Sequence, residues 1–273
     1  MNKILFDTIQ IIRNERNEFI NEASITSLVY GILYSCGWNV FDPYEVAPQY
    51  NVLTEEHPQR VDLALKVFGQ RKIFIEIKDI KKGKNLKKNE NQLKGYLQKT
   101  PDVKSGILTN SASWWFYDSK KDENDRITIN RQDKVNILKD NDSFIEKIFS
   151  QYLSKEKMVE KWYQANVGKL SNNSQKLSAI INLRKMKDRR VIEPLNQVFN
   201  EDKENYARIS ALNGIFELHK LGELDNRIMN QILKKASKDK SSSIREQSER
   251  FLNEMEKEEN RKIQKYKSDL GIQ

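Results

Sequence analysis

Two strand-like stretches, Arg60-Val61-Asp62-Leu63-Ala64-Leu65-Lys66-Val67 and Lys72-Ile73-Phe74-Ile75-Glu76-Ile77-Lys78, carry the pattern that decides the fold. Both are rich in β-branched or aliphatic residues, and both alternate with period two. The short segment between them contains Gly69-Gln70, so the pattern predicts a β-hairpin that turns there. A turn at that point places Asp62 opposite Ile77.

Three residues of this hairpin can do chemistry: Asp62, Glu76 and Lys78. Because side chains alternate along a strand, Glu76 and Lys78 share one face, and Asp62 reaches the same end of the sheet. Two carboxylates without a histidine form a hard-oxygen site that suits Mg²⁺ or Mn²⁺. A lysine beside them can orient an attacking water. The spacing alone leaves a second interpretation open, a solvent-facing ion pair across an amphipathic strand.

Composition narrows the class of protein. The chain has 273 residues, 37% of them hydrophobic and 32% charged, which is long enough for two domains. Its one cysteine, Cys36, excludes an internal disulfide and favours a reducing, cytoplasmic setting. Two histidines and one cysteine exclude a Cys/His zinc site. Without an apolar run of about 20 residues, we expect no membrane span.

The formal net charge of +9 is unevenly distributed. Residues 1–150 carry 23 basic and 21 acidic residues, whereas residues 151–273 carry 25 and 18. Within the first part, residues 71–99 hold ten basic residues against three acidic. We expect this strip to attract nucleic acid around the hairpin, although a solvated surface would have the same composition. The residues expected to contact nucleic acid are Arg60, Lys81, Lys82, Lys84, Lys87 and Lys88.

The hydrophobic patterns along the rest of the chain predict two domains. Residues 1–150 read as two helices, then strands, a helix over about 86–97, and two further strands with Trp114-Trp115-Phe116 alternating into the core. This order predicts an α/β mixed sheet flanked by helices. Residues 160–260 lack strand signals, and 177–183 resembles 209–215 at an offset of 32. Helix pairs repeating at that interval are typical of an α-solenoid and look like HEAT repeats. Residues 261–273 read as a charged tail.

The hairpin and its surroundings resemble the PD-(D/E)xK nucleases, and in particular the N-terminal nuclease domain of type I restriction enzyme R subunits. The matching pieces run in the family's order: Asn21-Glu22-Ala23 and Cys36-Gly37-Trp38, then RVDLAL, IEIKDI, the motif Gln92-x-x-x-Tyr96, and GILTNSASWWFYD. The resemblance therefore covers about residues 20–118 and implies a restriction-endonuclease-like fold.

The resemblance also implies a role for each matching residue. Asp62, Glu76 and the carbonyl of Ile77 would bind the metal, and Lys78 would position the water. Glu22 matches the family's helical acidic residue, with Glu18 one turn earlier as the alternative. Gln92 would contact nucleic acid or the edge of the site, while Tyr96 could equally be a core residue.

The sequence departs from the family in lacking the helicase motor that follows this domain. No G-x-x-x-x-G-K-[ST] motif occurs, and Gly168-Lys169-Leu170-Ser171 lacks the loop, so we expect no ATP site. We therefore expect a metal-dependent DNA endonuclease of bacterial restriction or anti-phage defence. The alternatives are an RNase, or an adaptor whose repeats recruit a protein partner while cleavage is absent or gated. A homodimer would allow both strands of a duplex to be cut.

Overall fold

The computed structural model describes residues 2–15, 21–52, 59–79 and 82–269, and they form two compact units, Met1–Glu160 and Lys161–Gln273. The boundary falls within the helix α5 (Lys155–Lys169). The functional roles of the two predicted domains stay predictions.

The first unit is built around one six-stranded sheet in the order β1-β2-β3-β4-β5-β6. The strands are β1 (Val46–Val52), β2 (Gln59–Val67), β3 (Gln70–Ile77), β4 (Ser105–Thr109), β5 (Ser113–Lys121) and β6 (Ile127–Asn136). Only β3 and β4 pair in parallel, and the segment that joins them contains η1 (Lys82–Asn89) and α3 (Glu90–Lys99). The predicted mixed sheet flanked by helices is confirmed.

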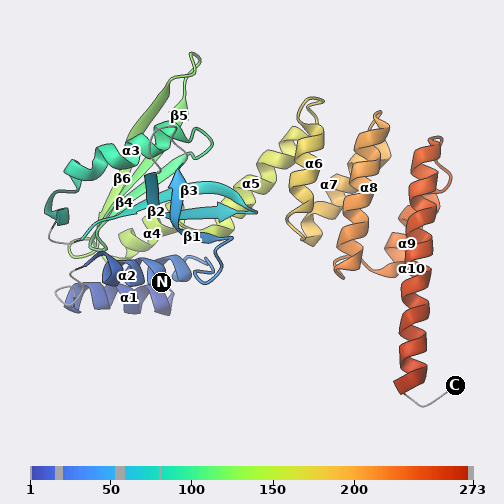
Figure 1. Ribbon diagram of the computed structural model, residues 1–273, viewed down its shortest axis with the longest axis horizontal. Helices are drawn as coiled ribbons and strands as arrows, with labels where there is room; N and C mark the ends of the chain where they lie inside the picture. The colour runs from blue at the N-terminus through green and yellow to red at the C-terminus, as the bar shows by residue number, and fades with distance from the viewer. Residues whose placement is uncertain (1, 16–20, 53–58, 80–81, 270–273) are drawn as a thin grey trace. The chain divides into compact units, whose positions relative to one another are not determined.

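Helices cover both faces of the sheet. Figure 1 shows α3 on one side, and α1 (Lys3–Glu15) and α2 (Glu22–Ser35) on the other. α3 contributes Leu93, Tyr96 and Leu97 to a buried cluster with Ala64 and Phe74 of the hairpin. On the other face α2 packs against β3, and α4 (Asp142–Tyr152) packs against β6. Because both faces are covered, the middle of β3 is buried.

The strand β5 alternates as predicted. Trp114 and Phe116 are fully buried, and both rings contact Phe149 of α4 at centroid distances of 5.1 and 6.3 Å. Trp115 points to the other face, where it is partly buried against the α3 cluster. These aromatic residues therefore serve the core, as expected.

The sequence pattern did not predict β6, and the hairpin turn lies one residue earlier than predicted. β6 is an edge strand with mostly exposed polar residues, and its pairing with β5 makes it a strand despite a weak apolar pattern. The hairpin turns at Phe68-Gly69, where both residues have positive φ (+50° and +78°), as a two-residue type I′ turn requires.

The second unit is entirely helical within the described residues. After α5 come α6 (Lys176–Arg184), η2 (Arg189–Val191), α7 (Ile192–Glu201), α8 (Asn205–Lys220), α9 (Asn226–Ala236) and α10 (Ser242–Asp269). α8 packs on α6 and α7, and α10 packs on α8 and α9. Their assignment as HEAT-like repeats stays a prediction. The predicted charged tail begins inside α10, which continues to Asp269.

No helix in the described ranges has the length and apolarity needed to cross a membrane.

Candidate active site

The β2–β3 hairpin brings Asp62 and Glu76 side by side. Leu63 pairs with Ile75, and the same register places Asp62 opposite Glu76, so the predicted pairing of Asp62 with Ile77 was wrong by one residue. Two local features cause the shift: the turn one residue earlier than expected, and a register irregularity between Leu65 and Lys66. The Asp62 side chain still reaches Ile77, because its Oδ2 accepts a hydrogen bond from the Ile77 N–H at 2.7 Å.

Glu76 is a buried carboxylate with one unsatisfied oxygen. The residue is 1% exposed, and its Oε1 accepts a hydrogen bond from Lys78 Nζ at 2.5 Å. Its Oε2 is buried without a hydrogen-bond partner among the described residues. Burial raises the pKa of Glu76 to about 7, and the neighbouring charges of Asp62 and Glu22 add to the rise while Lys78 opposes it. The solvent-facing ion pair that the spacing left open is therefore excluded for this residue.

Lys78 remains charged in this setting. Burial lowers the pKa of its amine, but the hydrogen bond to Glu76 and the negative charges nearby outweigh burial, so the net shift is upward. The structure thus assembles Asp62, Glu76 and Lys78 on the face of the sheet that α3 covers.

Glu22 lies on α2, outside the β2–β3 hairpin. It is the first residue of α2, whose N-cap Asn21 accepts a hydrogen bond from the Ser24 N–H at 2.8 Å. Its side chain is exposed, but its charge reaches Glu76 and Lys78 and raises the pKa of both. No group of three or more His, Cys, Asp or Glu side chains within the described ranges is arranged to hold a metal ion. Glu18, the alternative to Glu22, lies outside the described residues.

Gln92 and Tyr96 tie α3 to the start of β2. Gln92 Nε2 donates a hydrogen bond to the Tyr96 hydroxyl, which donates to the Arg60 carbonyl, each at 2.8 Å. Tyr96 is 4% exposed, so it serves the core and at the same time anchors the strand two residues before Asp62. Its pKa is raised by burial, and the charges of Glu76 and Asp62 contribute to the shift. The expected contact of Gln92 with nucleic acid stays a prediction.

Gln49 is a site residue that sequence analysis missed. Its Nε2 donates a hydrogen bond to Asp62 Oδ1 at 3.2 Å, and its backbone has a φ of +46°, unusual for a residue other than glycine. Asp62 is therefore held from both sides, by Gln49 on β1 and by Ile77 on β3. No pattern in the sequence signals a left-handed glutamine within a strand.

Several residues of the basic strip at 71–99 already form ion pairs. Arg71 pairs with Asp102, Lys94 pairs with Glu90, and Lys78 belongs to the site itself. Of the expected nucleic-acid contacts, Lys87, Lys88 and Arg60 are exposed, although the Arg60 Nε donates a hydrogen bond to Asn51. Lys81 and the side chains of Lys82 and Lys84 lie outside the described residues.

The part of the chain that contains the hairpin matches a known protein family. Residues 42–125 match the family model of the type I restriction enzyme R protein N terminus, which confirms the predicted resemblance for this part of the chain. The match covers under a third of the chain and includes Asp62, Glu76, Lys78 and Gln92, while Glu22 precedes it.

Among solved structures, the chain is similar to the type IIG restriction endonuclease BpuSI, with 15% identity and a TM-score of 0.32. The alignment covers 81% of this chain and 28% of that one, so the chain spans little more than a quarter of that enzyme's length. No curated protein matches the chain.

Proposed function

We propose, from the restriction-enzyme match of residues 42–125, that the chain is a metal-dependent endonuclease that hydrolyses DNA phosphodiester bonds. The observation that carries the proposal is the buried Glu76 carboxylate beside Asp62, with one unsatisfied oxygen and a charged lysine in contact. A buried carboxylate oxygen without a hydrogen-bond partner costs folding free energy, so the unsatisfied oxygen of Glu76 points to a bound ligand.

The chemistry of this group fits Mg²⁺ or Mn²⁺. Carboxylate oxygens are the ligands these hard cations prefer, and a divalent ion would oppose the burial and the neighbouring negative charges that raise the pKa of Glu76. Asp62 and Glu76 would hold it, with the Ile77 carbonyl and Glu22 as further proposed ligands. When bound, such a metal lowers the pKa of a coordinated water and neutralises charge on the phosphate.

The protein's own groups supply positioning and charge. Lys78, held charged by Glu76, would orient the attacking water and stabilise the negative charge that develops on the phosphate. The contacts of Gln49 and Ile77 to Asp62, and the Gln92–Tyr96–Arg60 link, would fix the carboxylates before substrate arrives. We propose that this chemistry needs no ATP and acts in cytoplasmic restriction or anti-phage defence, with a homodimer available to cut both strands.

A cleavage assay tests the proposal. Supercoiled plasmid, single-stranded DNA and RNA are incubated with the full chain and Mg²⁺ or Mn²⁺, with EDTA as the metal-free arm. Asp62→Ala and Lys78→Ala should each lower the cleavage rate at least about a hundredfold. Lys66→Ala is the matched control, because Lys66 lies at the turn end of the same hairpin.

The possible outcomes separate the candidate functions. Cleavage of RNA alone would make the chain an RNase. No metal-dependent cleavage of any of the three substrates would overturn the nuclease proposal for the isolated chain and favour a role as a binding or adaptor protein.

A further inference from the structure

Two buried ion pairs neutralise the carboxylates at the connections α7–α8 and α9–α10. Lys176 Nζ lies 2.5 Å from Asp202 Oδ2, and Arg208 donates to both oxygens of Asp239. The four side chains are between 8% and 11% exposed. Burial raises the pKa of both aspartates, but the hydrogen bonds that each accepts and the neighbouring positive charges together outweigh burial and hold each pKa below its usual range. Neither aspartate therefore adds free negative charge to the surface.

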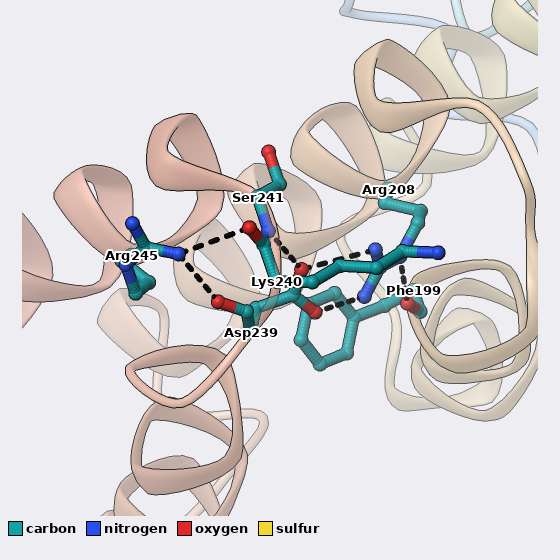
Figure 2. Close-up of polar contacts among 6 residues, drawn as sticks. All are labelled: Phe199, Arg208, Asp239, Lys240, Ser241 and Arg245. Carbon is teal, nitrogen blue, oxygen red and sulfur yellow. Dashed lines mark hydrogen bonds and ion pairs between the residues drawn. The ribbon is translucent and has the colours of Figure 1, made fainter.

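Figure 2 shows how firmly the second pair is held. Arg208 Nε also donates to the Phe199 carbonyl at 2.9 Å, and the Ser241 N–H donates to Asp239 Oδ1 at 2.9 Å. Arg245 donates to the backbone carbonyls of Asp239 and Lys240 at 2.7 and 3.0 Å. These contacts give the α9–α10 connection a fixed conformation from which Lys240 projects.

Four lysines surround these pairs: Lys203, Lys235, Lys238 and Lys240, here called the lysine rim. They line a groove of about 870 Å³ together with Asp202 and the Arg208–Asp239 pair, and all four are exposed. Within the described residues none of the four makes an ion pair. Glu201, which accepts a hydrogen bond from Gln197, is the one lining carboxylate without a cation partner among the described residues, so four ammonium groups face a single carboxylate that no cation neutralises.

Three other basic residues of this unit are paired with carboxylates. Arg184 bonds Glu217, Arg190 bonds Asp188, and Lys220 bonds Glu254. The run of basic residues from Arg184 to Arg190, which is the densest in this part of the sequence, is thus partly neutralised.

We propose that the lysine rim binds the phosphate backbone of duplex DNA without reading its sequence. Ammonium groups on flexible stems suit phosphates as point charges. The groove lining contains no apolar residue, which is typical of nucleic-acid interfaces and unlike the apolar centre of a protein–protein interface. The inference rests on the proposed function in taking DNA as the ligand, and it adds a second contact outside the nuclease unit.

The test measures DNA binding by the full chain in EDTA, so that cleavage is not needed. Lys203, Lys235, Lys238 and Lys240 are all replaced by glutamine, and binding of a labelled duplex is followed by fluorescence anisotropy over a range of salt concentrations. The charge-matched control replaces Lys257, Lys262, Lys265 and Lys267, four exposed lysines of α10, by glutamine. Thermal unfolding verifies that both variants fold.

We expect the rim variant to bind at least about tenfold more weakly, with a slope of log affinity against log salt shallower by roughly 2–4, since each phosphate contact contributes about 0.9. The double variants Lys203→Gln/Lys235→Gln and Lys238→Gln/Lys240→Gln should each lose part of this slope. Equal losses in the rim variant and the α10 control would overturn the proposal, as would a rim variant that binds the duplex as tightly as the wild type.

The two proposals fail separately. If the wild-type chain cleaves DNA while the rim variant binds as the α10 control does, only the lysine rim is wrong. If the rim result holds and the chain cleaves nothing, the nuclease proposal is wrong and the rim remains a DNA-binding surface.

Discussion

Glu76 and Asp62 share one neighbouring cation within the described residues, Lys78, which cannot neutralise both carboxylates. Lys78 satisfies one oxygen of Glu76, while the other is buried without a partner beside the carboxylate of Asp62. Repulsion between the two carboxylates and loss of hydration both disfavour the ionised form. A pair of carboxylates of this kind is expected at a site that binds a cation. The pair also makes the stability of the metal-free protein sensitive to pH.

The pKa of Glu76 predicts the direction of that sensitivity. It lies at about 7 in the folded protein against an ordinary value of 4.5, so between these pH values the folded state holds a proton that the unfolded state has lost. The free energy of unfolding should therefore fall as pH rises through this window, by up to about 3 kcal/mol. Urea unfolding in EDTA at pH 5 and pH 8 measures the loss.

Glu76→Gln should remove most of this loss, because glutamine carries no charge at either pH. Mg²⁺ should stabilise the wild type at pH 8 and stabilise Glu76→Gln much less. An identical pH dependence in the two proteins would contradict the role assigned to Glu76.

Gln49 combines backbone strain with a contact to Asp62. Gln49→Gly and Gln49→Ala both remove the hydrogen bond, but only alanine keeps the cost of a positive φ. Gln49→Gly should therefore be more stable than Gln49→Ala by about 1 kcal/mol in urea unfolding. Both should bind Mg²⁺ more weakly than the wild type by calorimetry, and unchanged affinity in both would show that Gln49 does not position Asp62.

The β2–β3 hairpin is the element that aligns the site, and its turn determines the register. Phe68-Gly69 closes the strands with positive φ at both residues, and the irregularity after Leu65 then shifts the pairing so that Asp62 meets Glu76. One residue fewer on either strand would place the two carboxylates on opposite faces of the sheet.

Gly69→Ala tests the turn without creating a clash. A Cβ at Gly69 meets no atom within 4 Å, so its cost comes from the φ of +78° alone and should be about 1 kcal/mol. Gly95→Ala is the matched control: its Cβ also meets nothing within 4 Å, but the residue lies in α3, where alanine should stabilise the protein by about 0.5–1 kcal/mol. Urea unfolding should show opposite signs, and equal effects would contradict the strain argument.

The two units of the molecule differ in how they use charge. The sheet unit gathers the buried carboxylate of Glu76 with the partly exposed Asp62 and Lys78, whereas the helical unit buries two ion pairs and leaves the lysine rim exposed. Each unit has its own buried core, so a lesion in one should leave the structure of the other intact.

Arg208→Ala tests this independence. The change leaves Asp239 buried without its cation and should destabilise the helical unit by about 3 kcal/mol or more. Arg184→Ala, which removes a more exposed partner of Glu217, should cost no more than about 1 kcal/mol. Hydrogen exchange should show the loss of protection by Arg208→Ala within residues 161–269, and equal loss in the sheet would contradict two independent units.

Sequence patterns were sufficient for part of the site. Period-two alternation placed Glu76 and Lys78 on one face and brought Asp62 to the same end of the hairpin, as the structure has them. The same reasoning failed for β6, whose exposed residues have little apolar pattern, and for the pairing of Asp62, which depends on a turn and an irregularity one residue long. The proximity of Glu22 to a metal site, predicted from the resemblance alone, stays a prediction.

The sequence by itself determined the class of fold and the gathering of Asp62, Glu76 and Lys78 at one end of the hairpin, because strand alternation is a local property of the chain. Only the tertiary structure decided that Glu76 is buried with one oxygen unsatisfied, that Gln49 holds Asp62, and that the lysines of the rim are unpaired while nearby arginines are not. Burial, pKa shifts and ion pairing arise from residues distant in sequence, and therefore no local pattern specifies them.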